Sequence, residues 1–129
     1  MEDTEKIKKY VRAANYLTVT QIYLQDNFLL ERKLKSSDIK PKLFGHWGTC
    51  PGINFTYAHV NHLVKKHKQS TIFVLGPGHG FPGLQANLFL EETLGTVMFI
   101  SNLATTLLFV RLTYFNKSTA VMLDNGIGV

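Results

Sequence analysis

Residues 72–83 read IFVLGPGHGFPG, and this stretch is the starting point for interpreting the chain. Its apolar first half, between turn-forming residues, predicts a buried strand over residues 70–76. The glycines that follow, with Pro82, predict a turn that leads into a helix from about residue 82. Two explanations fit so bare a loop. It is either a tight strand-to-helix turn, or a loop whose backbone N–H groups and helix N-terminus bind a phosphate or diphosphate.

The spacing of the glycines fits the pattern GxGxxG at Gly78, Gly80 and Gly83. This pattern alone is a weak sign of dinucleotide binding, because the full fingerprint has an acidic residue roughly 20 positions further on. The segment at that distance, VMFISNLATT, contains no acidic residue. No Gly-Lys-Ser or Gly-Lys-Thr follows either, so the loop is not a Walker loop. A small dinucleotide-binding protein therefore stays a less favoured alternative.

Each of two glycine-rich loops contains a histidine. His79 stands between two glycines, and His46 occupies a similar place in FGHWGTCPG, residues 44–52, ahead of another predicted helix. Histidine titrates near neutrality, so it can donate to a phosphate or relay a proton. Ligands of open α/β sheets bind at the ends of strands, so we expect the two histidines to meet at one end of a sheet. Separate positions on the surface are the alternative.

The remaining pattern predicts an α/β layered unit with one domain. Residues 4–16 and 52–67 have helical periodicity, residues 18–25 are ambiguous between helix and strand, and residues 29–52 form a long polar connection. His59 and His62 lie three apart on the second helix, but no cysteine or carboxylate has ligand spacing with them, so a core or surface role is favoured over a metal site. Likewise, a packed thiol is favoured over a nucleophile for Cys50.

The composition narrows the class of partner and the compartment. The chain has 129 residues, a net charge of +5 and an isoelectric point near 9.4, which mildly favour anionic partners. Its basic residues are scattered and no nucleic-acid motif is present, so nucleic-acid binding is not predicted. A single cysteine predicts no internal disulfide and a reducing compartment. The charged start, MEDTEKIKKY, does not resemble a signal peptide.

The last part of the chain differs from the rest in charge. Residues 1–92 contain 12 of the 14 Lys and Arg and 8 of the 9 Asp and Glu, whereas Leu94–Val110 is a run of 17 uncharged residues. A membrane-spanning helix needs about 20 predominantly apolar residues, so a buried core segment is favoured over a membrane span. Translation out of frame is a third explanation for residues 93–129, and we favour it over both.

Two quoted segments resemble the phosphoketolase family. They are GHWGTCPGINFTYAHVNHLVKKH and IFVLGPGHGFPGLQANLFLE, and the resemblance covers roughly residues 5–92. It implies that residues 1–92 are the N-terminal part of a truncated, partial three-layer α/β domain that binds thiamine diphosphate, as in transketolase, and that residues 93–129 are a tail outside the family. It also implies a cytosolic homo-oligomer with the cofactor at a subunit interface.

The resemblance also implies a site and a reaction. His46 and His79 would face the cofactor and a sugar phosphate, Gly78 and Gly80 would let the chain approach the diphosphate, and Thr49 would lie beside it. The family cleaves xylulose 5-phosphate or fructose 6-phosphate with inorganic phosphate, forming acetyl phosphate and an aldose phosphate. The family's Gly-Asp-Gly site for Mg²⁺ and its activating glutamate have no match here. We therefore expect this chain to be inactive alone, and a non-catalytic remnant or interaction module is the alternative.

Overall fold

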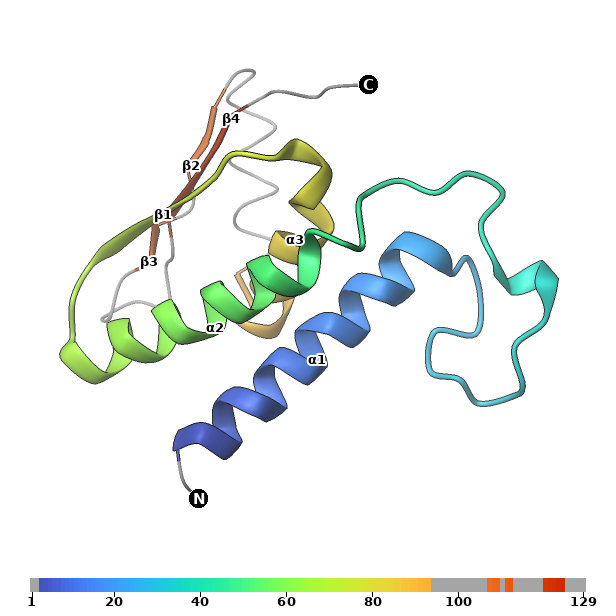
Figure 1. Cartoon of the computed structure of the whole chain (residues 1–129), viewed down its shortest axis with the longest axis horizontal. Coiled ribbons are helices and arrows are strands. Elements are labelled where there is room, and N and C mark those ends of the chain that lie inside the picture. Colours follow the sequence, from blue (N-terminus) through green and yellow to red (C-terminus); the bar gives the residue numbers. More distant parts are fainter. Residues whose placement is uncertain (1–2, 94–106, 110, 113–119, 125–129) are drawn as a thin grey trace.

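The computed structural model describes residues 3–93, 107–109, 111–112 and 120–124. Three helices dominate the described part, and a four-stranded sheet lies beside them (Figure 1). The elements in chain order are α1 (Asp3–Tyr23), η1 (Ser36–Asp38), α2 (Cys50–His67), β1 (Thr71–Leu75), η2 (Gly78–Gly80), α3 (Phe81–Leu90), β2 (Leu107–Phe109), β3 (Arg111–Leu112) and β4 (Ala120–Asp124).

Helix α1 continues beyond the predicted end at residue 16 and includes most of the ambiguous segment. The β-branched residues of this segment favour a strand by propensity. However, the hydroxyls of its two threonines form hydrogen bonds within the helix. Thr18 Oγ1 donates to Ala14 O at 2.7 Å, and Thr20 Oγ1 donates to Leu17 O at 3.0 Å. Both threonines are buried against the other helices. Tertiary packing therefore decides in favour of a helix.

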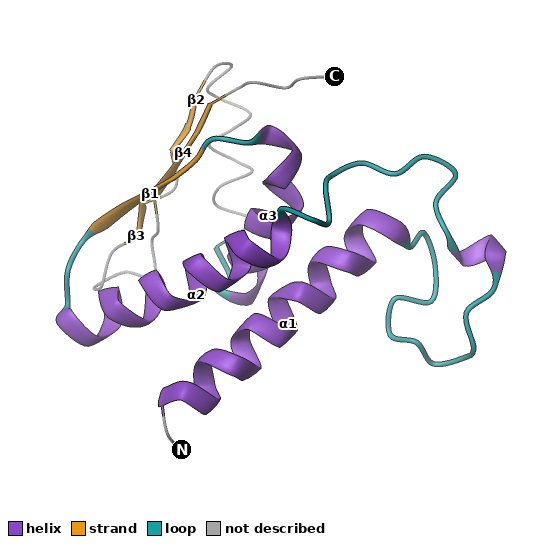
Figure 2. Cartoon of the chain, in the orientation of Figure 1, coloured by secondary structure: helices purple, strands orange, loops and turns teal. Residues whose placement is uncertain are grey.

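Strand β1 supplies the contact between sheet and helices. Leu75 is buried, and the ring of Phe73 meets that of Tyr57 on α2 edge to face, with centroids 5.2 Å apart. The side chains of Ile72 and Val74 point to the opposite face and are 65% and 60% exposed. In the described part of the chain, α2 and α3 therefore cover one face of β1 (Figure 2). The described part of the chain is thus mostly helical, and the three-layer α/β domain stays a prediction.

The sheet has the order β2-β4-β1-β3. Strand β4 is parallel to β1, whereas β3 is antiparallel to β1 and β2 is antiparallel to β4. Most of residues 93–129 lie outside the described residues, so their origin out of frame and the domain boundary near residue 92 stay predictions. Within the described residues, no helix combines the length and the apolar character that crossing a membrane requires.

The long connection between α1 and α2 is ordered by an ion pair instead of an apolar core. The Arg32 guanidinium binds both carboxylate oxygens of Asp38 at 2.7 Å, and Asp38 is only 1% exposed. Asp38 also accepts the Lys35 N–H at 2.8 Å. Large apolar side chains point outward from the same loop: Phe28, Leu29, Leu30, Leu34, Leu43 and Phe44. Polar groups are thus inside this loop and apolar groups outside, which is typical of a surface that another segment covers.

We predict that this loop opens in acid. The hydrogen bond from Arg32, followed by that from the Lys35 N–H, lowers the pKa of Asp38 to about 2. Since the ordinary pKa is about 3.9, protonation of Asp38 favours the open loop. The stabilisation is present above about pH 4 and is lost as the pH falls towards 2. Hydrogen exchange should show the protection factor of the Lys35 amide falling over that range.

Two variants control this measurement. Asp38→Asn should leave the Lys35 amide poorly protected at every pH, because the paired carboxylate is gone. Asp26→Asn should behave like the unchanged chain, since Asp26 is 71% exposed and makes a single contact with Arg32 at 3.0 Å. A protection factor that stays constant from pH 5 to pH 2 would contradict the assignment.

Candidate functional site

The glycine-rich loop after β1 folds into a tight turn. Gly78–Gly80 form the short 3₁₀ helix η2, which runs directly into α3. The Gly80 N–H donates to Pro77 O at 2.9 Å, and the Phe81 N–H donates to Gly78 O. Among the described residues, the N–H groups of Gly78 and His79 have no backbone acceptor. These two donors are therefore available for an anion, whereas the next two are used within the turn.

The second motif forms the start of α2. Thr49 is the residue before the helix, and its hydroxyl does not cap it. Instead, Thr49 Oγ1 lies 2.6 Å from His46 Nδ1. This contact engages one ring nitrogen of His46, whose side chain is exposed, and leaves Nε2 available. Thr49 therefore orients the imidazole.

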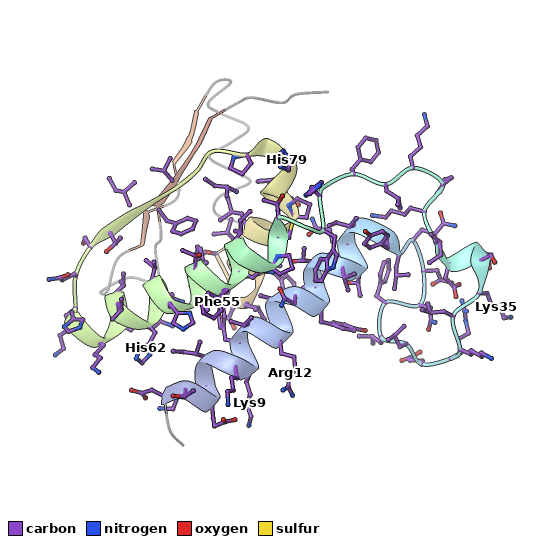
Figure 3. The ribbon with its side chains drawn as sticks, in the orientation of Figure 1. Lys9, Arg12, Lys35, Phe55, His62 and His79 are labelled. Atoms are coloured by element: carbon purple, nitrogen blue, oxygen red, sulfur yellow. The ribbon has the colours of Figure 1, made fainter. Side chains whose placement is uncertain are left out.

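The two motifs meet directly. The His46 N–H donates to the His79 carbonyl at 2.8 Å, and the two imidazole rings lie edge to face with centroids 5.2 Å apart. Both residues are exposed. Figure 3 shows His79 where the loop joins α3, close to the first turn of α2. The expectation that the two histidines lie together is confirmed, while the roles of His46, Thr49, Gly78, His79 and Gly80 in binding stay predictions.

Gly80 and Gly45 must be glycine for different structural reasons. A Cβ on Gly80 would lie 2.4 Å from Ile53 Cδ1, so Gly80 is small because α2 packs against it. Gly45 has φ +109° and a Cβ there would lie 2.5 Å from Pro82 Cγ. Because neither glycine has a side chain, the two motifs can lie close to each other.

Cys50 lies between the motifs but is not placed for attack on a ligand. It is fully buried, and its Sγ contacts the Gly80 carbonyl at 3.8 Å. Burial raises the pKa of the thiol, although backbone hydrogen bonds from Gly83 and His46 oppose this effect. The thiolate needed for nucleophilic attack is therefore disfavoured. The favoured interpretation, a packed thiol, is confirmed.

The other histidines lie elsewhere on α2. His59 Nδ1 lies 2.8 Å from its own helix's Phe55 O, and His62 Nε2 lies 3.6 Å from Asp3 Oδ2 on α1. In the part of the chain that the structure describes, no three His, Cys, Asp or Glu side chains gather as metal ligands would. The histidine pair at His46 and His79 is thus separate from these surface positions.

Sequence reasoning missed two polar clusters inside the helical layer. One consists of amides between the three helices, at the half-buried Asn15 and the buried Asn54 and Asn87. In the other, Glu91 accepts hydrogen bonds from Tyr57 at 3.0 Å and from Asn61. The available signal was an asparagine among apolar residues of a predicted helix, as at Asn87, which shares a helical face with Gly83 and Leu84.

Comparison with known proteins gives one family. Residues 1–108 match the family described as "XFP N-terminal domain". "Probable phosphoketolase 2" of Nostoc sp. is 56% identical over 92 residues, which are 71% of this chain and 12% of that protein. "Probable phosphoketolase 2" of Rhizobium meliloti is 61% identical over 84 residues, or 65% of this chain and 11% of that protein. The chain thus spans about 12% of the length of the curated relatives it matches.

We predict that Gly45→Ala destabilises the fold. The added Cβ meets Pro82 and the residue must keep a positive φ, so the free energy of unfolding should fall by about 1–3 kcal/mol. Gly52→Ala is the matched control, because no atom lies within 4 Å of a Cβ at this first-turn position of α2. That change should be neutral or should stabilise by up to about 1 kcal/mol. Equal urea midpoints for the two variants would refute the explanation given for Gly45.

Proposed function

Because this chain belongs to the phosphoketolase family, we propose that its two histidine motifs form part of a site for thiamine diphosphate and a sugar phosphate. The observation that supports this most directly is the joining of the motifs through His46 N–H and His79 O at 2.8 Å. The parent reaction is the cleavage of xylulose 5-phosphate or fructose 6-phosphate with phosphate, in carbohydrate metabolism. This chain supplies only part of that site.

The groups available at the pair suit a diphosphate. The N–H groups of Gly78 and His79 lack an acceptor among the described residues, and the first turns of α2 and α3 lie beside them. Free N–H groups and helix N-termini favour negative charge at the same point. Mg²⁺ would need oxygen ligands. In the described ranges, no three His, Cys, Asp or Glu side chains lie close enough together to hold a metal ion. The diphosphate therefore fits these residues, whereas the metal does not.

The histidines would act on the sugar phosphate. The chemistry that thiamine diphosphate supplies when bound is attack by its ylid carbon on a ketose carbonyl. With Nδ1 held by Thr49, His46 presents Nε2 as donor or acceptor according to its tautomer. His79, 5.2 Å away, presents a second imidazole to the same point. Together they would bind the sugar hydroxyls and relay protons.

The proposal includes the rest of the fold. In a three-layer domain, a second layer of helices would cover the exposed face of β1 at Ile72 and Val74. As expected for this family, we propose a cytoplasmic homo-oligomer with the site at a subunit interface, and an isolated chain that is inactive. The boundary near residue 92 stays a proposal, and the family match itself runs to residue 108, so that only residues 109–129 lie beyond it.

A second candidate function is that of an interaction module without catalysis. The observation in its favour is the loop between α1 and α2, where Leu29 and Phe44 are 76% and 77% exposed. Apolar side chains of this size, held outward by an ordered loop, mark a surface that a partner covers. This candidate requires no diphosphate binding at the histidine pair.

Titration calorimetry with thiamine diphosphate, with and without Mg²⁺, tests the proposed site. We expect the chain to bind, and His79→Ala to weaken binding by about ten- to hundredfold, since a hydrogen bond to a charged group contributes roughly 1.5–3 kcal/mol. His62→Ala is the matched control, because it removes a histidine on α2 that lies away from the pair (Figure 3).

Two results would contradict the proposal. One is equal affinity of His79→Ala and His62→Ala. The other is no heat of binding from a chain whose circular dichroism shows the expected helices, and this result would favour the interaction module.

A further inference from the structure

Side-chain amides form a hydrogen-bonded ladder through the contact of the three helices. Asn54 of α2 is at its centre, and its Nδ2 donates to Asn15 Oδ1 at 2.8 Å and to Thr18 Oγ1 at 3.1 Å, both on α1. Asn87 of α3 continues the ladder, since its Nδ2 donates to Asn54 Oδ1 at 2.8 Å. Asn54, Asn87 and Thr18 are all 0% exposed.

The ladder lies directly beneath the two histidine motifs. Cys50 follows His46 by one helical turn and Asn54 by two, while Gly83 and Asn87 follow His79 in the same way. Asn87 Nδ2 also donates to Gly83 O at 2.7 Å. The amide of Asn87 therefore links the first turn of α3 to Asn54 on α2.

Helices α2 and α3 lie close together at this level. A Cβ on Gly83 would lie 3.1 Å from Asn54 Oδ1 and 3.5 Å from Cys50 Cβ. A glycine contributes no side chain to the ridges that interlock packed helices, so the register at this level needs another determinant. Directional hydrogen bonds between amides fix the register, as a buried asparagine does in coiled coils.

Stability alone does not explain the ladder. The Oδ1 of Asn87 is buried with no hydrogen-bond partner among the described residues. A buried acceptor without a partner is unfavourable, whereas two apolar side chains of similar shape would be equally or more stable there. The polar pair is therefore better explained by the geometry it imposes than by the stability it adds.

We propose that Asn54 and Asn87 are positioning residues that set the register of α2 against α3 and so hold His46 against His79. The ring geometry of the pair, with centroids 5.2 Å apart, is the consequence of this register. The effect on diphosphate binding rests on the proposed function, whereas the effect on the rings does not.

The double variant Asn54→Leu/Asn87→Leu tests the proposal. It should still fold, with a thermal midpoint lowered by no more than about 8 °C, because both partners of the Asn54–Asn87 hydrogen bond are replaced together and only the acceptors on Asn15, Thr18 and Gly83 lose a donor. The nuclear Overhauser effects between the imidazoles of His46 and His79 should nevertheless weaken. Affinity for thiamine diphosphate should fall about tenfold or more, since a binding site about 1 Å too loose loses its preorganisation.

A gentler matched pair decides the matter if the double variant does not fold. Thr18→Val removes the hydroxyl that accepts from Asn54, whereas Thr20→Val makes the same change at a buried threonine outside the ladder. Only Thr18→Val should shift the ring signals of His46 and His79. The proposal is overturned if a folded double variant keeps the ring contacts, or if the two threonine variants give the same ring signals.

The two proposals fail in different ways. If the unchanged chain does not bind thiamine diphosphate, the proposed function fails, but the ring contacts still report on the ladder in the free protein. If binding is normal and the ring contacts do not depend on Asn54 and Asn87, only the positioning role fails.

Discussion

The close crossing of α2 and α3 is the constraint on which the candidate site depends. The helices meet where Gly83 leaves room for Asn54 and Cys50, and where Gly80 leaves room for Ile53. Helix α2 begins four residues after His46 and α3 begins two residues after His79, so this crossing brings His46 and His79 together. The backbone hydrogen bond between the motifs, at 2.8 Å, then completes the arrangement. A larger side chain at either glycine would separate the helices and the histidines with them.

Order in the rest of the described chain has two different origins. The helical layer is ordered by apolar burial, with Tyr57, Leu84 and Leu88 fully enclosed between α2, α3 and β1. The loop after α1 has no such core and is ordered by Asp38, which binds Arg32 through both oxygens. Because its interior is ionic, the loop leaves apolar side chains such as Phe44 at the surface. Of these apolar residues, Phe44 lies two residues before His46 in the sequence.

The site supplies N–H donors and imidazoles, but among the described residues no three His, Cys, Asp or Glu side chains gather as a metal site would need. The 53–61% identity to proteins named phosphoketolase covers about an eighth of their length. A chain that matches so small a part of these proteins is consistent with a site of which only a part is present here. The two N–H groups at Gly78 and His79 and the two exposed imidazoles all lie within residues 1–108, the range that matches the family. The amide ladder joins the two helices that follow them.

Local patterns in the sequence were sufficient for the strand over residues 71–75, the turn after it, the helices on either side and the two histidine motifs. Periodicity and turn propensity act over a few neighbouring residues, so they can be read without the fold. The length of α1, the burial of Cys50 and the packing reason for Gly80 depended on contacts with other elements. So did the amide ladder, which joins residues 33 to 39 positions apart. No local pattern encodes such a contact. The sequence by itself therefore determined which chemical groups are present, and only the tertiary structure decided the distance between them, because the register of packed helices is set by side chains remote in the chain.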